Sequence, residues 1–291
     1  MMFEDVPEQE TDDLAAHVAT QESSYSLGMP ELSHTGLSEQ WMLKTLGDRH
    51  WRLIAAAAGQ AKASFRDRNG REVYAAFCGL SVAAPHFGRP DLDDRLDIRS
   101  TLHRVSPARL ASEHVLRIGA TEIARVCLVS TFISRTRDGE NRSVARVDFP
   151  GLPVLPALPA RQQFPREAAR LARQGADGHF GLAMPAELTR GPDETLRPNP
   201  SLDFNRAGLL YFPSFVAVAE RAVGTRMGRA SDGLVLRRRD VLFFGNVELH
   251  EPISVFVTDC VHDEDRFRAA VALKGSDDRP LCQVFCEYGR A

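Results

Sequence analysis

The stretch Pro200-Ser-Leu-Asp-Phe-Asn-Arg-Ala-Gly-Leu-Leu-Tyr211 begins as a polar turn and leads into a long apolar run. Asp203 and Asn205 favour a turn or a helix start, because a short side-chain oxygen accepts a hydrogen bond from a free backbone amide. A helix that is apolar nearly all round is a buried helix. We therefore expect a buried helix that ends at Gly224, with Pro213 either kinking it or starting a second helical segment.

An earlier stretch, Pro30-Glu-Leu-Ser-His-Thr-Gly-Leu-Ser-Glu-Gln-Trp-Met-Leu43, has the same construction. Each stretch starts with Pro-x-Leu, passes through a polar turn and a glycine, and enters an apolar helix. The earlier helix is expected to break at Gly47-Asp48, to resume at Arg49 and to end at Gly59. Two stretches built alike indicate a duplicated unit.

Runs with the character of strands follow each helix. Residues 95–105 alternate polar and apolar side chains, which is typical of a half-buried strand. Asn69-Gly70 predicts a hairpin turn just before the first run. The expected strands are 73–82, 95–105, 112–118, 121–135 and 143–147 after the first helix, and 239–249, 253–261, 266–273 and 280–288 after the second. One helix followed by several antiparallel strands is an α+β unit whose sheet can wrap its helix, and the chain contains two.

The composition suggests four segments. Residues 1–28 hold seven acidic residues and no Lys or Arg, which predicts a mobile N-terminal extension or, alternatively, a docking segment for a partner. Residues 29–147 form the first unit. The proline-rich residues 148–199 are expected to be an extended connector with one short helix at 166–174. The second unit takes residues 200–291.

Charge and composition exclude several classes of protein. The 291 residues carry a net charge of -3, which argues against a dedicated nucleic-acid binder. No apolar run approaches the roughly 20 residues of a membrane span, and the acidic start lacks the features of a signal peptide. The five cysteines lie in apolar runs, as expected of free thiols in a reducing cytoplasm. No Cys/His spacing is typical of a zinc site, so no metal is predicted.

Four motifs carry a resemblance to a known family. They are Met29-Pro-Glu-Leu32, Gly36-Leu-Ser-Glu39, Leu46-Gly-Asp-Arg-His-Trp51 and Asp203-Phe-Asn-Arg-Ala-Gly-Leu-Leu-Tyr-Phe212. They resemble the bifunctional acyltransferase/decarboxylase of leinamycin biosynthesis and its relatives in polyketide clusters, over roughly residues 29 to 290. The resemblance implies a double hot-dog fold, in which two helices are each wrapped by an antiparallel sheet.

The resemblance also implies an activity. Such an enzyme takes a methylmalonyl group from coenzyme A, decarboxylates it, and delivers propionyl to the phosphopantetheine arm of an acyl carrier protein. It implies acyl-coenzyme A as substrate, no permanently bound cofactor, and a homodimer. The family's candidate acyl acceptor is a tyrosine on an early strand, which matches Tyr74 in Glu72-Val-Tyr-Ala-Ala-Phe77. Tyr74 is interpreted either as a nucleophile or as a hydrogen-bond donor to the thioester. Without the resemblance, Tyr74 would be better interpreted as a structural tyrosine in the core with a hydrogen-bonded hydroxyl.

Decarboxylation of a malonyl thioester develops an enolate, so the site must offer hydrogen-bond donors. The two turns that precede the helices supply the candidates, since a helix N-terminus has free amides. In the first turn these are the amides of Gly36 and Leu37, with His34 as acid or base. In the second they are the amides near Arg206, with the side chain of Asn205. Purely structural interpretations are also open: Gly36 as a turn glycine, His34 as a solvated histidine and Asn205 as a helix cap.

Two further groups are candidates for contact with the substrate. Asn246 follows Gly245 within an expected strand, where it marks either a bulge or a polar group that faces a ligand. Arg237, Arg238 and Arg239 form a basic run that is expected to meet either coenzyme A phosphates and an acidic carrier protein or only solvent.

Three alternatives remain open from the sequence. A hot-dog thioesterase would use a carboxylate near a helix turn, for which Asp203 or Glu39 could serve. A dehydratase would need an acid and base pair, for which His34 with Asp203 is the candidate. A non-catalytic module that binds a carrier protein would need neither. The nucleophile-elbow motif of serine hydrolases, Gly-x-Ser-x-Gly, is absent from the sequence.

Overall fold

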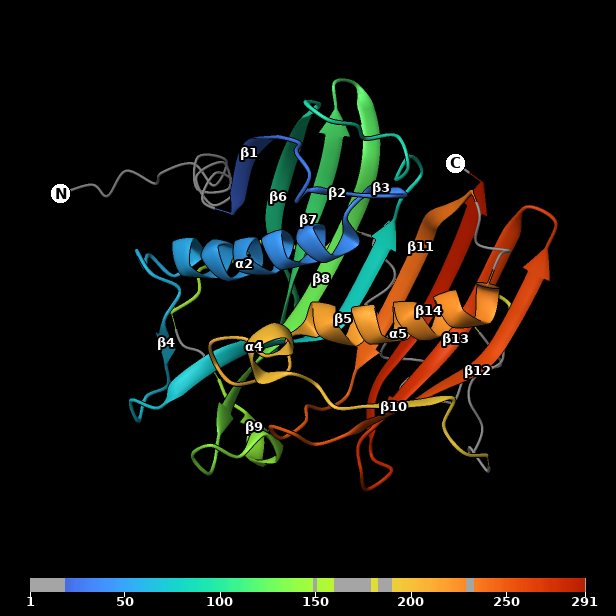
Figure 1. Ribbon diagram of the computed structural model, residues 1–291. Helices are drawn as coiled ribbons and strands as arrows, with labels where there is room; N and C mark the ends of the chain where they lie inside the picture. Colours follow the sequence, from blue (N-terminus) through green and yellow to red (C-terminus); the bar gives the residue numbers. More distant parts are fainter. Residues whose placement is uncertain (1–18, 149–150, 160–178, 183–189, 229–232, 291) are drawn as a thin grey trace.

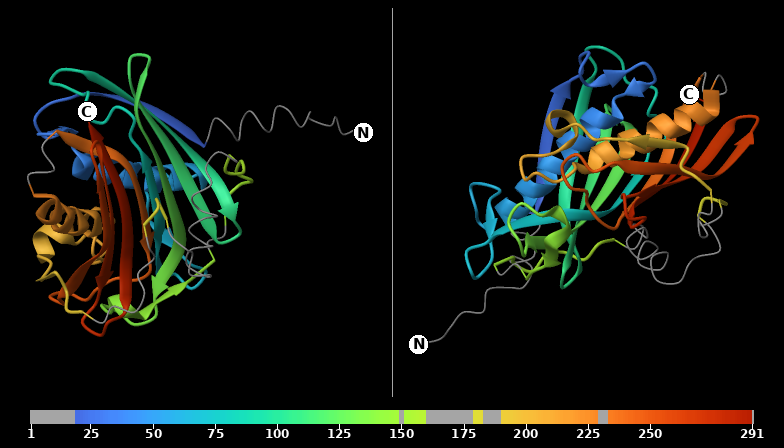
Figure 2. Two further views of the ribbon diagram at one scale, coloured as in Figure 1. Left: turned by 90° about the vertical axis from the view of Figure 1, so that its right-hand side faces the viewer. Right: turned by 60° about the horizontal axis from the view of Figure 1, so that its bottom comes forward.

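Twelve of the described strands form one long antiparallel sheet against which two long helices pack, and two short strands pair as a separate hairpin (Figure 1). The computed structural model describes residues 19–148, 151–159, 179–182, 190–228 and 233–290. Along the sheet the strands follow the order β1-β6-β7-β8-β5-β11-β14-β13-β12-β10. Figure 2 shows the sheet curving past both helices, so that each helix has a sheet half of its own.

The first unit pairs helix α2 (Glu39–Ala57) with the first half of the sheet. Its long strands are β1 (Thr20–Ser26), β5 (Glu72–Ala83), β6 (Arg95–Ser106), β7 (Arg109–Ile118) and β8 (Thr121–Arg135). Its short elements are β2 (Leu32–Ser33), β3 (Gly36–Leu37), β4 (Phe65–Arg66), η1 (Asn141–Ser143) and β9 (Val144–Arg146). The Oγ of Ser38 caps α2 by accepting from the amide of Trp41, as expected of a serine before a helix.

The second unit repeats this order of elements. Its helices are α4 (Pro200–Asp203) and α5 (Phe212–Met227), and its strands are β10 (Glu194–Leu196), β11 (Leu234–Phe243), β12 (Ile253–Asp263), β13 (Arg266–Lys274) and β14 (Pro280–Arg290). In both units an edge strand comes first, then the long helix, then four strands in the same spatial order. The predicted duplication of a helix-plus-sheet unit is therefore present in the structure.

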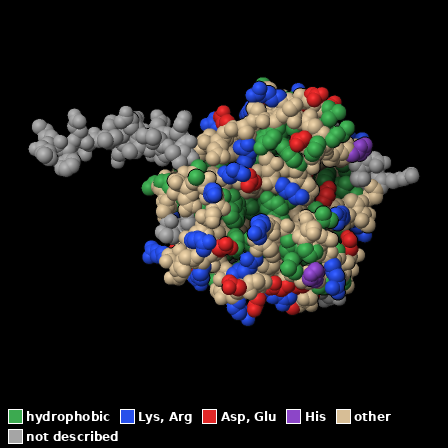
Figure 3. Space-filling view, turned by 60° about the vertical axis from the view of Figure 1, so that its left-hand side comes forward, with side chains coloured by type: hydrophobic (Ala, Val, Ile, Leu, Met, Phe, Trp, Pro, Cys, Tyr) green, Lys and Arg blue, Asp and Glu red, His purple; other side chains and the backbone are tan. Residues whose placement is uncertain are grey.

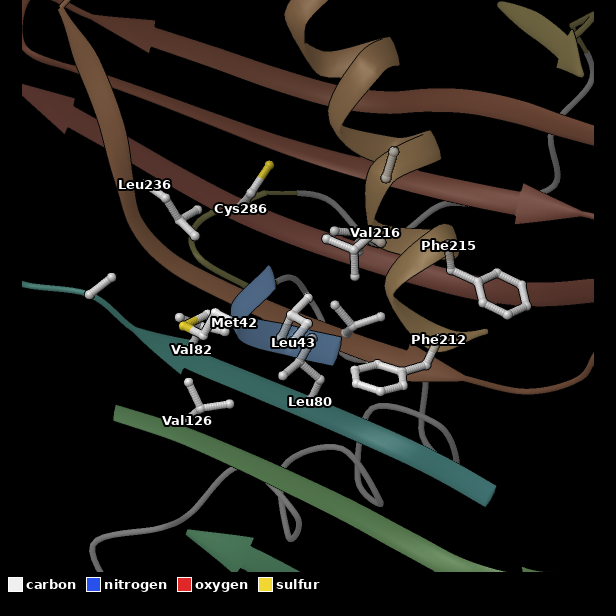
Figure 4. Packing of buried hydrophobic residues seen from close by; sticks show 14 of the residues in the cluster. Met42, Leu43, Leu80, Val82, Val126, Phe212, Phe215, Val216, Leu236 and Cys286 are labelled. Carbon is white, nitrogen blue, oxygen red and sulfur yellow. The ribbon is translucent and has the colours of Figure 1, made fainter. Parts of the chain in front are cut away.

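Strands β5 and β11 join the two halves into one sheet. They pair antiparallel from Gly79 opposite Leu242 to Ala83 opposite Arg238. One hydrophobic core runs above this junction, with side chains from both helices and both strands (Figure 4). Met42, Leu43, Val216 and Leu80 are fully buried in it. The two units are therefore packed as one body rather than as separate domains.

The predicted break in the first helix does not occur, since α2 continues through Gly47. A Cβ atom at Gly47 would lie 2.7 Å from Cε1 of Phe212 and 3.1 Å from the hydroxyl of Tyr211. The glycine therefore serves the close approach of α2 to the start of α5, and not a turn within its own helix. Because that neighbour comes from the other unit, the local sequence could not indicate it.

Replacing Gly47 by alanine is expected to destabilise the protein by about 1–3 kcal/mol, because the new methyl group collides with a buried ring. This loss exceeds the roughly 1 kcal/mol that alanine gains over glycine within a helix. Gly224 is a matched control, since it lies within α5 and a Cβ there meets no atom within 4 Å. Gly224→Ala should raise the midpoint of urea denaturation, and Gly47→Ala should lower it. Equal shifts in both variants would contradict this role for Gly47.

In the second unit, the observed ends of one helix and one strand differ from the predicted ones. Leu209 and Leu210 precede α5, and Pro213 starts that helix rather than kinking it. The helix passes Gly224 and ends at Gly228, whose φ of 53° suits a glycine. Strand β11 begins at Leu234 and ends at Phe243, several residues earlier than the predicted 239–249.

Both edge strands lie in segments that the sequence assigned to no unit. β1 pairs with β6 and comes from residues 1–28, so this part of the predicted mobile extension belongs to the sheet. β10 pairs with β12 and comes from the predicted connector. Elsewhere in the connector, the amide of Leu158 donates to the carbonyl of Arg104 on β6, at 3.2 Å. The short helix predicted at 166–174 lies outside the described residues.

A chain of buried polar side chains links α2 to the sheet of the first unit. Ser100, His114, Ser112, His50 and Ser130 follow one another with 2.7 Å between successive polar atoms. All five are at most 1% exposed. Burial lowers the pKa of His50 to about 3, and burial together with His50 lowers the pKa of His114 well below 6.5. Both imidazoles are therefore neutral at physiological pH.

These histidines should make stability depend on pH. An unfolded histidine titrates near 6.5, whereas folded His50 binds a proton only near 3. Below about pH 6.5 the unfolded state gains protons that the folded state cannot, so stability falls with pH until the folded pKa is reached. His50 alone should cost about 2 kcal/mol between about pH 8 and pH 5. Urea denaturation should show a shallower pH dependence for His50→Gln than for the exposed control His86→Gln. Identical pH profiles would contradict the assignment.

None of the helices in the described residues is long and apolar enough to cross a membrane. All five cysteines are free thiols, as predicted. On the face shown in Figure 3, basic and acidic side chains are interspersed around hydrophobic ones, consistent with the small net charge.

Candidate active site

A cavity of about 270 Å³ opens where the two units meet. Its walls come from β5, from the loop that leads into α5, and from the chain that continues after β11. Phe77, Phe212, Phe215 and Phe243 form an aromatic wall, with ring centroids 4.4 Å apart between Phe77 and Phe212. The ionisable side chains of the described lining are Tyr74, Cys78, Arg146 and Tyr211. The ionisable groups that this lining offers for chemistry are therefore phenols, a thiol and a guanidinium.

Tyr74 lies on β5 and lines the cavity, as a catalytic role requires. Its hydroxyl donates to Oε2 of Glu72 at 2.6 Å, and the guanidinium of Arg135 lies 5.5 Å from its ring centroid. Burial, and after it the hydrogen bond to Glu72, raises the pKa of Tyr74 above 10. The phenol is therefore protonated at neutral pH and can donate a hydrogen bond. To attack a carbonyl it must give its proton to a base, and Glu72 is in contact.

Asn205 lines the same cavity, so the structure brings it together with Tyr74. Its Oδ1 accepts from the amides of Ala207 and Leu209, at 3.0 and 3.1 Å. These bonds hold the turn that leads to α5. Asn205 is not a helix cap, since α5 begins only after Tyr211.

The backbone amides of this turn are largely engaged. Those of Ala207 and Leu209 donate to Asn205, and that of Leu210 donates to Oδ1 of Asn246 at 2.8 Å. The side chain of Arg206 is exposed and is not part of the described lining. Few of these amides are therefore free to bind an anion, which is the role predicted for them.

Asn246 lines the cavity, but it follows β11 instead of lying within it. Its Nδ2 donates to the carbonyl of Leu210 at 3.1 Å, while its Oδ1 accepts from Leu210 and Val247. The side chain thus acts as a brace between the chain after β11 and the turn before α5. Its hydrogen bonds are structural, and the predicted strand bulge is wrong.

The first turn does not reach the cavity. His34 is exposed on the hairpin of β2 and β3. The amide of Leu37 donates to the carbonyl of Phe87, and a Cβ at Gly36 would lie 2.3 Å from that oxygen. Gly36 therefore permits the close approach of another backbone segment, and not of a substrate. His34, Gly36 and Leu37 are absent from the described lining.

The three consecutive arginines have three different environments. Arg239 is fully buried and pairs with Glu39 at 2.7 Å and with Glu220. Arg238 is exposed and lies 4.3 Å from the ring centroid of Phe180. Arg237, at a bulge in β11, donates to the carbonyls of Pro85 and Arg290. The predicted shared basic surface for coenzyme A or a carrier protein is therefore wrong for Arg239 and is not formed by the run as a whole.

The carboxylates suggested for a thioesterase or a dehydratase are also engaged elsewhere. Asp203 accepts from the amide of Asn199 at 2.7 Å, at the start of α4. Glu39 is bound to Arg239 within the core. Neither carboxylate belongs to the described lining of the cavity.

The aromatic wall, Cys78 and Arg146 were not identified from the sequence. Phe77 lay in a quoted motif, but nothing local showed that it would meet Phe212 of the other unit. Cys78 occupies a bulge in β5 between Phe77 and Gly79, which a regular strand pattern does not reveal. Within the described ranges, no cluster of His, Cys, Asp and Glu is arranged to hold a metal ion.

Comparison with solved structures defines the class of fold. The 12:0-ACP thioesterase from Umbellularia californica matches with a TM-score of 0.64 and 10% identity, over 94% of this chain and 98% of that one. An acyl-ACP thioesterase from Bacteroides thetaiotaomicron matches with a TM-score of 0.59 and 11% identity, over 92% and 97%. HtdX of Mycobacterium tuberculosis matches with a TM-score of 0.51 and 10% identity, over 92% and 98%.

These likenesses confirm the double hot-dog fold predicted from the sequence. At such low identities they establish the fold and not the activity. The sequence matches no known family profile. No relative was found among curated proteins.

Proposed function

We propose that the protein is an enzyme that acts on acyl thioesters in the cavity beside Tyr74. Specifically, it decarboxylates a malonyl-type thioester and transfers the acyl group from coenzyme A to an acyl carrier protein. The observation that carries the proposal is the contact of the Tyr74 hydroxyl with Glu72 at the wall of an aromatic cavity. The sequence resemblance to acyltransferase/decarboxylases supports it, since Tyr74 is the position that matches their acyl acceptor.

Acyl transfer would proceed in two steps. The Tyr74 oxygen attacks the thioester carbonyl as its proton passes to Glu72, and the bond to sulfur breaks to release coenzyme A as the thiolate. The thiol of the carrier then attacks the tyrosyl ester and gives its own proton to the phenol oxygen, while Glu72 passes the proton it received to the coenzyme A thiolate. Splitting the transfer in this way is ordinary covalent catalysis.

Decarboxylation breaks the carbon–carbon bond to release carbon dioxide, leaves the electron pair as an enolate on the thioester oxygen, and ends when the α-carbon takes up a proton from water. The groups beside Tyr74 that can stabilise this charge are its hydroxyl and the guanidinium of Arg135, which lies 5.5 Å from the Tyr74 ring centroid and outside the described lining. Nη2 of Arg135 donates to Asn141 at 2.6 Å and to the carbonyl of Ala207. This fixed cation requires no rearrangement during the reaction.

A thioesterase is the second candidate, and the similarity in fold to acyl-ACP thioesterases favours it. The two activities differ in what accepts the acyl group. Release of coenzyme A should be measured with malonyl-, methylmalonyl- and acetyl-coenzyme A, each with and without a phosphopantetheinylated carrier. Release that requires both the carrier and a malonyl-type donor is the expected result. Release without any carrier would show hydrolysis, and no release would favour a binding module; either result would overturn the proposal.

A further inference from the structure

Asn141 is a buried polar residue in contact with the turn that lines the cavity. It opens η1, the short helical turn that follows β8, and it is only 3% exposed. The backbone amides of Asn141 and Arg142 donate to the two carboxylate oxygens of Glu248, at 3.1 and 2.9 Å. These bonds fix the start of η1 against the chain that follows β11.

The side-chain amide of Asn141 joins three separate segments. Its Oδ1 accepts from Nε and Nη2 of Arg135 at the end of β8, at 3.3 and 2.6 Å. Its Nδ2 donates to the carbonyls of Gly208 and Val247, at 2.7 and 2.8 Å. A guanidinium can only donate and a carbonyl can only accept, so an amide meets both needs where a carboxylate or an apolar side chain does not.

The bonds from Asn141 hold the guanidinium of Arg135 beside Tyr74. Nη2 of Arg135 also donates to the carbonyl of Ala207, a residue that lines the cavity. The guanidinium lies 5.5 Å from the ring centroid of Tyr74. A long, flexible arginine side chain keeps one position only where fixed partners offset the entropy that it loses. Asn141 supplies two of the hydrogen bonds that do so.

The position of Arg135 matters because its charge acts on the phenol of Tyr74. Burial and then Glu72 raise the pKa of Tyr74, whereas Arg135 acts to lower it. Arg146 on β9 is a further cation of the cavity lining, and it lies across β8 from Tyr74. A cation held near the phenol favours the phenolate that attack on a thioester requires, and this effect weakens as the two charges separate.

We propose that Asn141 is a positioning residue of the candidate active site, which holds the guanidinium of Arg135 against Tyr74. This inference rests on the proposed function, since it takes Tyr74 to be the group that reacts. Asn141 is outside the described lining of the cavity and acts through Arg135.

The first test replaces Asn141 by leucine, which has a similar size and none of the hydrogen bonds. We expect kcat for acyl transfer to the carrier to fall about 10- to 100-fold, with KM for the thioester within about twofold, as for a catalytic group that is displaced slightly. In an Arg135→Leu background, Asn141→Leu should lower kcat no further, because Arg135 carries its effect. A loss of the same size in both backgrounds would overturn the proposal.

Arg135→Lys tests the same point without altering Asn141. The ammonium keeps the positive charge but cannot reproduce the paired bonds from Nε and Nη2 to Asn141. We therefore expect kcat to fall about as far as in Asn141→Leu. A wild-type kcat in Arg135→Lys would overturn the proposal, since the charge would then suffice without the position that Asn141 gives it.

The titration of Tyr74 tests the positioning without any turnover. Its signal is followed by NMR of ring-labelled tyrosine, assigned by its absence in Tyr74→Phe, at pH values where the protein stays folded. Titration should begin at higher pH in Asn141→Leu than in wild type. Arg142→Leu is the matched control, because Arg142 is adjacent to Asn141 in η1 but pairs with Glu251. It should leave both the titration of Tyr74 and kcat unchanged.

The outcomes separate the two proposals. Transfer by the wild-type protein, with the same titration of Tyr74 in Asn141→Leu, would overturn the positioning role and leave the proposed function standing. A shifted titration in a protein that loads no carrier would overturn the proposed function, while Asn141 would still be shown to hold Arg135 against Tyr74. A shifted titration together with the fall in kcat is the expected result.

Discussion

Replacing Tyr74 by phenylalanine is expected to lower the rate of acyl transfer by about 100-fold or more while the protein stays folded. The change removes one oxygen atom, which is the proposed acyl acceptor and the group that contacts Glu72. Acid–base groups in contact with the reacting atoms contribute about 10²- to 10⁴-fold to rates, and a lost nucleophile costs at least as much. The rate should be measured as acyl loading of the carrier, at saturating thioester.

Tyr25→Phe is the matched control for this variant. Tyr25 lies on β1, where its hydroxyl accepts from Arg49 and its ring meets Trp41. It takes no part in the described lining of the cavity, so its loss should leave the rate within about twofold, as is usual for changes remote from the chemistry. Glu72→Gln should also slow transfer, because the phenol then has no carboxylate to receive its proton. A Tyr74→Phe protein with the unchanged rate would remove Tyr74 from the chemistry.

Replacing Arg239 by methionine is expected to destabilise the protein by about 3–5 kcal/mol. Arg239 is fully buried, and it joins Glu39 at the start of α2 to Glu220 on α5 and to the hydroxyl of Tyr288 on β14. Burial would lower the pKa of Arg239, but these partners raise it well above its usual value. Without the arginine, the buried carboxylate of Glu39 has lost its counter-charge.

The pH dependence of this loss identifies its cause. Burial raises the pKa of Glu39, and Arg239 opposes that rise. In the variant the opposition is gone, so Glu39 should protonate more readily in the folded state. A raised folded pKa gives stability that is present at low pH and lost as pH increases through it. The difference from wild type should therefore shrink toward acidic pH.

Arg238→Met is the control, because Arg238 is adjacent to Arg239 in the sequence but its side chain is exposed. Among the described residues it gives up a cation–π contact with Phe180, worth about 0.5–1 kcal/mol. Urea denaturation of both variants at several pH values is the measurement. Similar losses for the two arginines, or a loss for Arg239→Met that is independent of pH, would contradict the role of the buried ion pairs.

These two sites also show what the repeated sequence pattern could and could not predict. Both Pro-x-Leu turns lead into a buried helix, as predicted. At the start of α5 the pattern places Phe212 beside the cavity. At the start of α2 it places Glu39 against Arg239 in the core. The sequence pattern predicts the same local structure at the starts of α2 and α5. Whether a cavity or an ion pair forms there depends on the strand that lies against each helix start.

Most of the long strands were predicted near their observed limits, whereas the polar edge strand β1 was not predicted. The alternation in 95–105 and 121–135 gave β6 and β8 nearly at their observed limits. β1 reads Thr-Gln-Glu-Ser-Ser-Tyr-Ser, and it lies at the edge of the sheet with none of its residues fully buried. Its place depends on pairing with β6, which is remote in sequence. A polar edge strand therefore resembles a loop when only its composition is considered.

The candidate site was predictable in part for the same reason. Tyr74 and Asn205 were both singled out and both line the cavity. The arginine run was misread because a bulge between Leu236 and Arg238 alters the direction of successive side chains. The parting of β5 from β11 before Gly79 had no local signal, since it arises because the chain after β11 follows β14.

The proposed acyl transfer is tested most directly by the intact mass of a phosphopantetheinylated carrier after incubation with this protein and methylmalonyl-coenzyme A. We expect a carrier that bears propionyl, lighter by one carbon dioxide than the methylmalonyl adduct, and we expect this product not to form with Tyr74→Phe. A carrier left unmodified, with coenzyme A released into solution at the same rate whether or not the carrier is present, would contradict acyl transfer and identify hydrolysis as the activity.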